Sequence, residues 1–281
     1  MEKIDGRKVA LFGATGGIGE ELCRYILELG GTLIMVGRSE EKLQMLQDRL
    51  QTDFPDAQNS YLLCELEEME SVVKVCEVLK EKDVDVLIHN AGAYSIPRKT
   101  CDTGYDNVYQ INFVSPYYIT NRLLSHLEEK EGKVITVGSI AHNYSKIDEK
   151  DWDFSARSRA SLVYGNAKRQ LMFAMMQLAK EHPKVHFAIT HPGITFTNIT
   201  NHYPKLIFFL IKNPMKWIFM KPKKAALSIL QGLFEETVED EWIGPRWFDV
   251  WGNPKKKRLH TCSEEEKRSI NNNAKSLKVV I

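Results

Sequence analysis

The chain of 281 residues lacks an excess of either charge, because 38 lysines and arginines stand against 37 aspartates and glutamates. A net charge of +1 gives no basis for bulk electrostatic binding, so no nucleic-acid partner is expected. The five cysteines are scattered and include no Cys-x-x-Cys pair, which excludes a small disulfide scaffold. We interpret them as reduced thiols in a reducing compartment.

Long hydrophobic runs are also missing. The most apolar stretch, residues 203–221, is interrupted by lysines and by Pro214, and its longest apolar run covers only residues 206–211. A membrane span needs about 20 such residues. The first residues carry no apolar segment of the kind found in a signal peptide. We therefore expect a cytoplasmic protein.

Short apolar runs alternate with longer amphipathic runs along the chain. Strands are expected at residues 8–12, 32–36, 60–63, 84–89, 133–137 and 185–190, with helices between them, the longest at 105–130 and 162–181. Strands that are apolar almost throughout are typical of a parallel sheet buried on both faces. The pattern predicts an α/β fold with a doubly wound parallel sheet. We expect one domain over residues 1–281, with an insert at 199–221 and a flexible tail at 259–281.

A glycine-rich turn follows the first expected strand, at Gly13-Ala14-Thr15-Gly16-Gly17-Ile18-Gly19. Glycines let the backbone turn tightly and approach a pyrophosphate, and the helix that follows offers free N–H groups at its N-terminus. The spacing is neither Gly-x-Gly-x-x-Gly, because Leu22 replaces the third glycine, nor a P-loop. A turn without a ligand is the alternative, but the order of strand, turn and helix favours a dinucleotide site.

The end of the second expected strand indicates which dinucleotide is bound. The strand runs into Gly37-Arg38-Ser39 and carries no carboxylate for the ribose 2′-hydroxyl of NAD. The guanidinium of Arg38 can pair with the 2′-phosphate of NADP, although a solvated surface arginine would look the same. The sequence thus predicts NADP(H), with NAD(H) as the less favoured cofactor.

Tyr164 and Lys168 lie four residues apart on an expected helix and so share one face. A nearby ammonium lowers the pKa of a phenol, which is otherwise about 10. Such a tyrosine can exchange a proton with an alcohol or a carbonyl oxygen. Pairs with this spacing are common on amphipathic helices, so this pair gains its meaning from the dinucleotide-type turn that precedes it.

Together these motifs resemble the short-chain dehydrogenase/reductase family. Asn90-Ala91-Gly92 is similar to the end of the family's Asn-Asn-Ala-Gly motif, with His89 in place of the first Asn. Asn112 and Ser139 match the family's helix asparagine and catalytic serine, and residues 191–197 resemble its nicotinamide loop. A narrower likeness is to the retinol-dehydrogenase-like branch, in which an interval of 25 residues between Ser139 and Tyr164 is usual.

The resemblance implies a Rossmann-type fold and a role for each matched residue. Tyr164 would be the general acid/base, and Lys168 would lower its pKa and bind the nicotinamide ribose. Ser139 would stabilise the carbonyl oxygen, and Asn112 would hold a water in a proton relay. The residues expected to contact the cofactor are Gly13, Thr15, Gly16, Gly17, Ile18, Gly19, Arg38, Ser39, Glu65, Leu66, Asn90, Ala91, Gly92, Tyr164, Lys168, Pro192, Gly193, Ile194 and Thr197.

The function expected from the resemblance is that of an NADP(H)-dependent short-chain alcohol dehydrogenase or carbonyl reductase. It would interconvert a hydroxyl and a ketone or aldehyde on a hydrophobic substrate such as a steroid, a bile-acid-like sterol or a retinoid. A catalytically silent NADP(H)-binding sensor is the alternative. No metal is expected, since His142, His186 and His191 lack a ligand spacing.

The apolar insert allows two interpretations. A C-terminal helical substrate lid would include Phe208, Phe209, Trp217 and Phe219. A peripheral membrane contact is the competing interpretation, favoured by the lysines between them. The sequence also leaves open a homodimer or a homotetramer.

Overall fold

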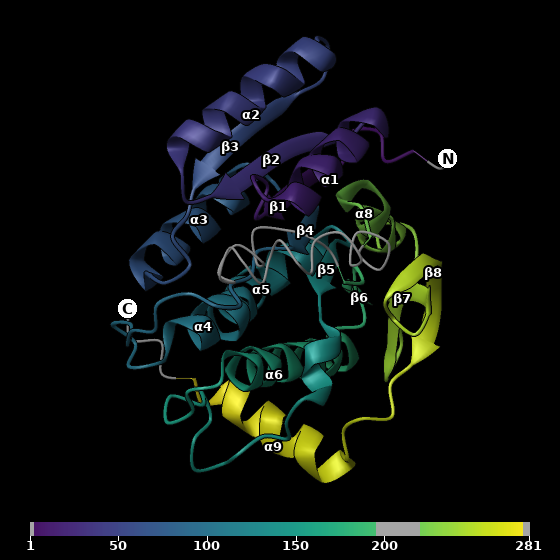
Figure 1. Ribbon diagram of the computed structural model, residues 1–281. Coiled ribbons are helices and arrows are strands. Elements are labelled where there is room, and N and C mark those ends of the chain that lie inside the picture. Colours follow the sequence, from purple (N-terminus) through teal and green to yellow (C-terminus); the bar gives the residue numbers. More distant parts are fainter. Residues whose placement is uncertain (1–2, 195–219, 278–281) are drawn as a thin grey trace, which may run out of the picture.

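The computed structural model describes residues 3–194 and 220–277 (Figure 1). Its centre is an eight-stranded sheet in the order β3-β2-β1-β4-β5-β6-β7-β8. Every strand pairing is parallel except that between β7 and β8. The strands are β1 (Lys8–Phe12), β2 (Thr32–Gly37), β3 (Asn59–Leu63), β4 (Val86–His89), β5 (Lys133–Val137), β6 (His186–Thr190), β7 (Glu241–Trp247) and β8 (Trp251–Arg258).

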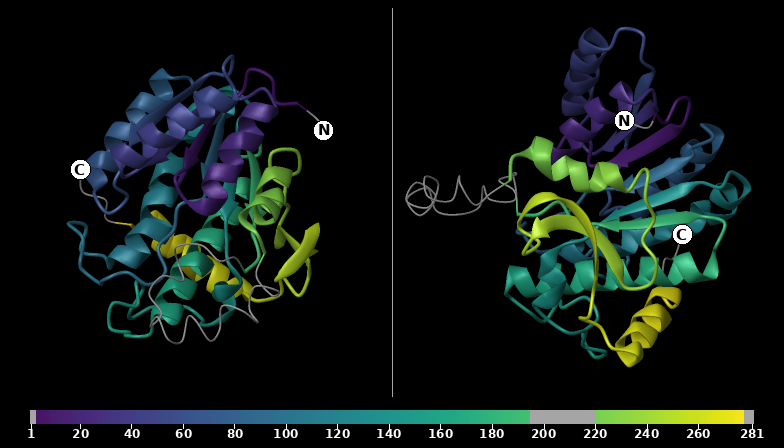
Figure 2. Two further views of the ribbon diagram at one scale, coloured as in Figure 1. Left: turned by 45° about the horizontal axis from the view of Figure 1, so that its top comes forward. Right: turned by 90° about the vertical axis from the view of Figure 1, so that its right-hand side faces the viewer.

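Helices cover both faces of this sheet (Figures 1 and 2). One face packs against α1 (Gly17–Glu28), α2 (Glu40–Asp53) and α8 (Pro222–Gln231). The other packs against α3 (Met69–Glu81), α5 (Ser115–Glu129) and α6 (Ala160–Glu181). Successive side chains of a strand point to opposite faces of the sheet and so pack in two separate hydrophobic cores. In β1, Val9 and Leu11 face α1, whereas Ala10 and Phe12 face α3 and α5. The doubly wound α/β fold predicted from the sequence is therefore confirmed.

The edge formed by β7 and β8 was not anticipated from the sequence. Near its start β7 contains the buried residues Trp242 and Ile243, but Gly244 and Pro245 follow. Glycine and proline are uncommon inside strands, so the sequence did not predict one here. β8 carries Pro254 and a run of lysines, residues that suit an edge strand because they oppose further pairing. The sequence analysis searched for short apolar runs, and such runs do not identify a polar edge strand such as β8.

The prediction of a flexible tail over 259–281 is corrected by the structure. Residues Glu264–Lys275 form α9, which packs along α6. Ser263 caps the helix by accepting a hydrogen bond from the backbone N–H of Glu266. The buried side chains Ile270 and Ala274 lie one turn apart and form a narrow apolar stripe. The other residues of α9 are polar or charged, so the sequence did not predict a packed helix here.

A buried ion pair fastens α9 to α6. Arg169, of which only 2% is exposed, lies 2.7 Å from the carboxylate of Glu266. The same guanidinium donates a hydrogen bond to the carbonyl oxygen of His142 at 2.9 Å and another to that of Thr261. The C-terminal helix is thereby held against the helix that carries Tyr164 and Lys168.

The single helix expected at 105–130 is divided in three. It consists of α4 (Asn107–Tyr109), a π-helical turn η1 (Gln110–Val114) and α5. Pro116 has no N–H to donate to the preceding turn, which favours the wider hydrogen-bond spacing there. The π-helical turn contains Asn112.

Two further sequence expectations concern the apolar insert and membrane spanning. Most of the insert at 199–221, including Phe208, Phe209, Trp217 and Phe219, lies outside the described residues. Within residues 3–194 and 220–277, no helix combines the length and hydropathy that crossing a membrane requires.

Candidate active site

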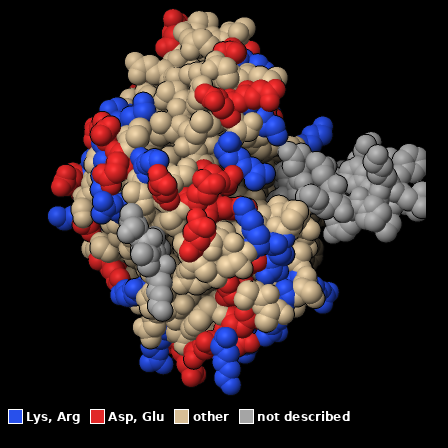
Figure 3. Space-filling view, turned by 90° about the vertical axis from the view of Figure 1, so that its left-hand side faces the viewer, with Lys and Arg blue, Asp and Glu red and all other residues tan. Residues whose placement is uncertain are grey.

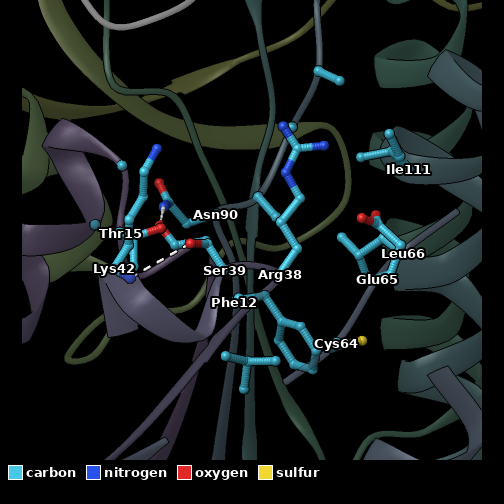
Figure 4. Close-up of a pocket in the computed structure, with 18 of the residues that line it drawn as sticks. Phe12, Thr15, Arg38, Ser39, Lys42, Cys64, Glu65, Leu66, Asn90 and Ile111 are labelled. Atoms are coloured by element: carbon cyan, nitrogen blue, oxygen red, sulfur yellow. Dashed lines mark hydrogen bonds between the residues drawn. The ribbon is translucent and has the colours of Figure 1, made fainter. Parts of the chain in front are cut away.

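A cavity of about 390 Å³ opens at the carboxyl ends of β1, β2 and β4 (Figure 4). Ligands of open α/β sheets bind at this edge, where the strand order reverses. The predicted cofactor contacts that line it are Gly13, Thr15, Gly16, Gly17, Ile18, Gly19, Arg38, Ser39, Glu65, Leu66, Asn90, Ala91 and Gly92. The structure thus gathers residues from four separate segments of the sequence around one space.

The glycine-rich turn is shaped for close approach of a ligand to the backbone. Gly13 has φ +81°, and a Cβ there would lie 2.8 Å from the backbone of Ala91. A Cβ on Gly19 would lie 2.1 Å from the carbonyl oxygen of Gly13, so only glycine fits at either position. Asn90 fixes the turn by donating from Nδ2 to the same carbonyl oxygen at 3.0 Å.

The start of α1 is open toward this cavity. Gly16 is its N-cap and has no side chain to accept from the first N–H groups of the helix. Gly17, Ile18 and Gly19, which carry these groups, line the cavity. An anion such as a pyrophosphate would satisfy them, with further stabilisation from the helix dipole. The residues present therefore fit a dinucleotide.

Arg38 extends from the end of β2 into the cavity, between Ser39 and Lys42 on one side and Glu65 and Leu66 on the other (Figure 4). Within the described part of the chain no carboxylate forms an ion pair with Arg38, so its guanidinium is available to a ligand. Ser39 caps α2 by accepting from the backbone N–H of Lys42 at 3.4 Å. The sequence reasoning missed Lys42 as a second cation here, although it stands one turn after Arg38 at the beginning of a predicted helix.

Three of the four predicted catalytic residues, Ser139, Tyr164 and Lys168, converge beside the cavity. Ser139 follows β5 and caps the short 3₁₀ helix η2 (Ile140–Asn143), accepting from the N–H of Ala141 at 3.2 Å. Tyr164 and Lys168 project from α6, and Lys168 Nζ lies 5.8 Å from the centre of the Tyr164 ring. That Nζ donates to the carbonyl oxygen of Val137, at the end of β5, at 2.9 Å.

The electrostatics of this group differ from the sequence expectation. Burial raises the pKa of Tyr164 to about 12, and a hydrogen bond from Ser139 opposes the shift only in part. Burial also lowers the pKa of Lys168 to about 8. The lowering of the tyrosine pKa by Lys168 that the resemblance implies is not found among the described residues: desolvation dominates both pKa values, because it disfavours the charged form of each group.

Asn112 holds the cavity wall next to Lys168. Its Nδ2 donates to the carbonyl oxygens of Ala93, at 2.7 Å, and Val108, at 2.8 Å, and its Oδ1 accepts from the N–H of Ala93. A Cβ on Gly92 would lie 2.9 Å from Asn112 Oδ1 and 3.6 Å from Lys168 Nζ. The amide of Asn112 thus fixes the segment after β4, and the π-helical turn directs it there.

His89 occupies the position of the family's first Asn without entering the cavity. Its ring lies in the core, where Nε2 is 2.8 Å from the hydroxyl of Thr120 and the ring stacks on Phe12. Burial, with a smaller contribution from the charge of Lys168, lowers the pKa of His89 to about 3. The main chain of the motif is preserved, because this side chain points away from it.

The loop after β6 contains the residues predicted to contact the nicotinamide. His191 stacks on Trp242, with ring centroids 4.9 Å apart. Gly193 has φ +84° and is too close to Val250 and Pro245 for any Cβ. Pro192, Gly193 and Ile194 are described but do not line the cavity, and Thr197 lies outside the described residues.

The fold and site define a dinucleotide-dependent oxidoreductase, and comparison with known proteins places it in a family. A family model described as short chain dehydrogenase matches residues 7–205. The chain belongs to the short-chain dehydrogenase/reductase family and is an NAD(P)-dependent oxidoreductase.

The relatives agree with the likeness to retinol dehydrogenases. A polyprenol dehydrogenase from Homo sapiens is 24% identical over 275 residues, which cover 92% of this chain and 81% of the relative. Retinol dehydrogenase 14 from Mus musculus is 26% identical and covers 78% of this chain and 70% of the relative.

Solved structures show the same fold. An uncharacterized protein from Mycobacterium paratuberculosis superposes with a TM-score of 0.80 at 20% identity, covering 100% of this chain and 97% of that one. A short-chain dehydrogenase from Sphingobium yanoikuyae in complex with NADPH gives a TM-score of 0.63 at 19% identity, covering 83% and 86%.

Proposed function

We propose that the protein is an NADP(H)-dependent alcohol dehydrogenase or carbonyl reductase that acts on a hydrophobic substrate. The observation that carries the proposal is the convergence of Ser139, Tyr164 and Lys168 next to a cavity shaped for a dinucleotide. A protein that only sensed the nucleotide would not need a proton donor, a hydroxyl partner and an ammonium beside it.

The residues divide the chemistry of such a reaction between them. When bound, the cofactor supplies or accepts the hydride. The Tyr164 hydroxyl gives a proton to the substrate oxygen in reduction and takes it back in oxidation. The Ser139 hydroxyl donates a hydrogen bond to the same oxygen and stabilises the negative charge that develops on it. Lys168, whose Nζ lies 5.8 Å from the centre of the Tyr164 ring, would offset negative charge that develops on the phenolate.

The preference for NADP(H) is supported by charge at the end of β2. Arg38 has no ion-pair partner among the described residues, and Lys42 lines the same wall of the cavity. Two cations without a carboxylate between them suit a 2′-phosphate better than a 2′-hydroxyl.

A lipophilic alcohol or carbonyl is the substrate class that we favour. The named relatives are a polyprenol dehydrogenase and a retinol dehydrogenase, and both names refer to lipophilic alcohols. The apolar residues of the insert at 199–221 are consistent with such a substrate. The steroid, sterol and retinoid classes all remain within this proposal.

The test is a screen of cofactor oxidation with NADPH and NADH across retinoid, steroid and small carbonyl panels. We expect NADPH-dependent reduction of at least one apolar carbonyl, with a higher kcat/KM than with NADH. Tight NADPH binding without turnover on any panel would instead support the sensor.

A further inference from the structure

The turn between β7 and β8 presents three aromatic side chains to solvent. Phe248 is 84% exposed, and its neighbours Trp247 and Trp251 are 50% and 51% exposed. We call these three residues the aromatic tip. Single exposed apolar residues are ordinary, but a cluster of three large rings is typical of a surface that meets a partner or a membrane.

The backbone of the turn is unfavourable for the residue that it carries. Phe248 has φ +52° and Asp249 has φ +56°, in the left-handed region that bulky side chains rarely adopt. Asn or Gly would adopt this conformation at lower cost. Folding stability therefore does not account for a phenylalanine here, and its ring is not used in the core.

The surroundings of the aromatic tip carry a positive charge that no carboxylate of residues 3–194 and 220–277 pairs with, that of Arg246. The guanidinium of Arg246 lies 5.4 Å over the ring of Trp247. Asp249, the one acidic residue of the turn, is paired with Lys257 at 2.7 Å. The face of the molecule in Figure 3 differs, since acidic and basic side chains are interspersed there.

A second group of cations lies at the start of α8, which runs beside the hairpin in Figure 1. The residues concerned are exposed and have no ion-pair partner within the described residues: Lys221, Lys223 and Lys224. Met220 links them to the turn, because its N–H donates to the carbonyl oxygen of Ile194 at 2.9 Å. The N–H of Ile194 in turn lies 3.4 Å from the carbonyl oxygen of Val250.

The same contacts place the aromatic tip at the functional edge of the sheet. β7 is parallel to β6, so its carboxyl end is at the edge where the cofactor cavity opens. His191 Nε2 lies 2.9 Å from the carbonyl oxygen of Asp249, so the turn packs on the loop that follows β6. The start of α8 reaches the glycine-rich turn, where a Cβ on Gly17 would lie 3.6 Å from Pro222.

We propose that the aromatic tip, with Arg246 and the lysines at the start of α8, docks the protein on an anionic phospholipid bilayer. Tryptophan and phenylalanine rings favour the boundary between headgroups and acyl chains, and nearby cations are attracted to anionic lipid. A protein partner or a second copy would need a complementary acidic and apolar patch, whereas a bilayer offers both features over any area. Docking in this way brings the site edge to the lipid.

Vesicle flotation of the full chain tests the proposal. We expect binding to vesicles of phosphatidylcholine with phosphatidylserine, little binding to phosphatidylcholine alone, and weaker binding at high salt. Phe248→Asn removes the most exposed ring and suits the positive φ, so it should leave the melting temperature unchanged or raise it. We expect it to weaken vesicle binding about tenfold, the effect of withholding part of a phenylalanine's burial.

Met45→Gln is the matched control. Met45 is an exposed apolar side chain on α2, 58% accessible, and its replacement should leave vesicle binding unchanged. Equal binding to both vesicle types, or undiminished binding of Phe248→Asn, would overturn the proposal. A dimer in sedimentation that Phe248→Asn dissociates, without vesicle binding, would also overturn it by identifying a second copy as the occupant. The assay contains no cofactor, so its outcome is independent of the proposed oxidoreductase reaction.

Discussion

The ring of Tyr94 packs edge-on against the ring of Tyr164, with centroids 5.3 Å apart and planes at 81°. Tyr94 lines the cofactor cavity, whereas Tyr164 stands beside it on α6. This contact joins the dinucleotide cavity to the proton-transfer group. The segment after β4 therefore has two tasks: to shape the cavity and to fix the catalytic phenol.

Replacement of Tyr164 by Phe should remove turnover and keep cofactor binding. The ring and its contact with Tyr94 remain, but the proton donor is lost, and such groups contribute about 10²–10⁴-fold to rate. The measurements are kcat with the best substrate and NADPH affinity by fluorescence titration. Tyr61→Phe, on β3 and away from the cavity, serves as the control. Activity of Tyr164→Phe above about a tenth of the wild-type value would contradict the assignment of the general acid.

Replacement of Arg38 by Asp should shift the preference between the cofactors toward NAD(H). A carboxylate at the end of β2 repels the 2′-phosphate of NADP(H) and can accept from the 2′-hydroxyl of NAD(H). We expect kcat/KM for NADPH to fall by about tenfold or more, the equivalent of 1.4 kcal/mol, and that for NADH to fall less or rise. Arg49→Asp tests the effect of the charge change alone, because Arg49 lies on the outside of α2 and pairs with Glu20. Equal losses for both cofactors in Arg38→Asp would place the 2′-phosphate elsewhere.

Removal of the Arg169 charge should destabilise the fold strongly. Arg169→Met leaves Glu266 without its partner, and breaking a buried pair in this way costs about 3–5 kcal/mol. The free energy of unfolding in urea measures the effect. Lys180→Met, on the same helix, removes the exposed ion pair with Glu239 and should cost less than about 1 kcal/mol. Similar losses in the two variants would show that the Arg169 pair contributes no more than a surface contact.

His89 should make stability depend on pH on the acid side. Its pKa is lowered to about 3 in the folded protein, from about 6.5 when exposed, so the unfolded state binds the proton more readily. Its contribution is complete above pH 6.5 and is lost as the pH falls from about 6.5 toward 3. His89→Asn, which can still bond to Thr120, should show a smaller fall between pH 7 and pH 5. Unfolding free energies at both values are the measurement, and an identical fall in both proteins would exclude His89 as the cause.

The sequence predicted the parts of the fold that follow from local patterns. Six of the seven strands that pair in parallel, β1 to β6, were predicted because each coincides with a short, largely apolar run, and the glycine-rich turn was predicted because its backbone permits few alternatives. β7, β8 and α9 were missed because their stability depends on partners distant in sequence. The stripe of α9 holds only two apolar side chains, and its ion pair with Arg169 cannot be predicted without the fold.

In the site, too, local sequence patterns predicted some features, whereas others depend on contacts between distant segments. The positions of Arg38, Tyr164 and Lys168 could be inferred from motifs, since spacing along one element decides them. The raised pKa of Tyr164 could not, because it depends on desolvation in the folded protein and on neighbours such as Tyr94 and Tyr144 that lie on other segments. The roles of Tyr94 and Lys42 at the cavity also required the structure.

The pairing of Arg169 with Glu266 implies that α6 completes its packing only after α9 has been synthesised. The two residues are 97 positions apart, so a chain that has emerged as far as β8 contains the guanidinium but not the carboxylate. Until α9 arrives, α6 cannot bury Arg169 without a large electrostatic penalty. The sheet can form early on the ribosome, but the helix that holds Tyr164 and Lys168 settles fully only when nearly the whole chain is available. A chain truncated before Glu266 would therefore leave exposed the face of α6 that α9 covers, even with every catalytic residue present.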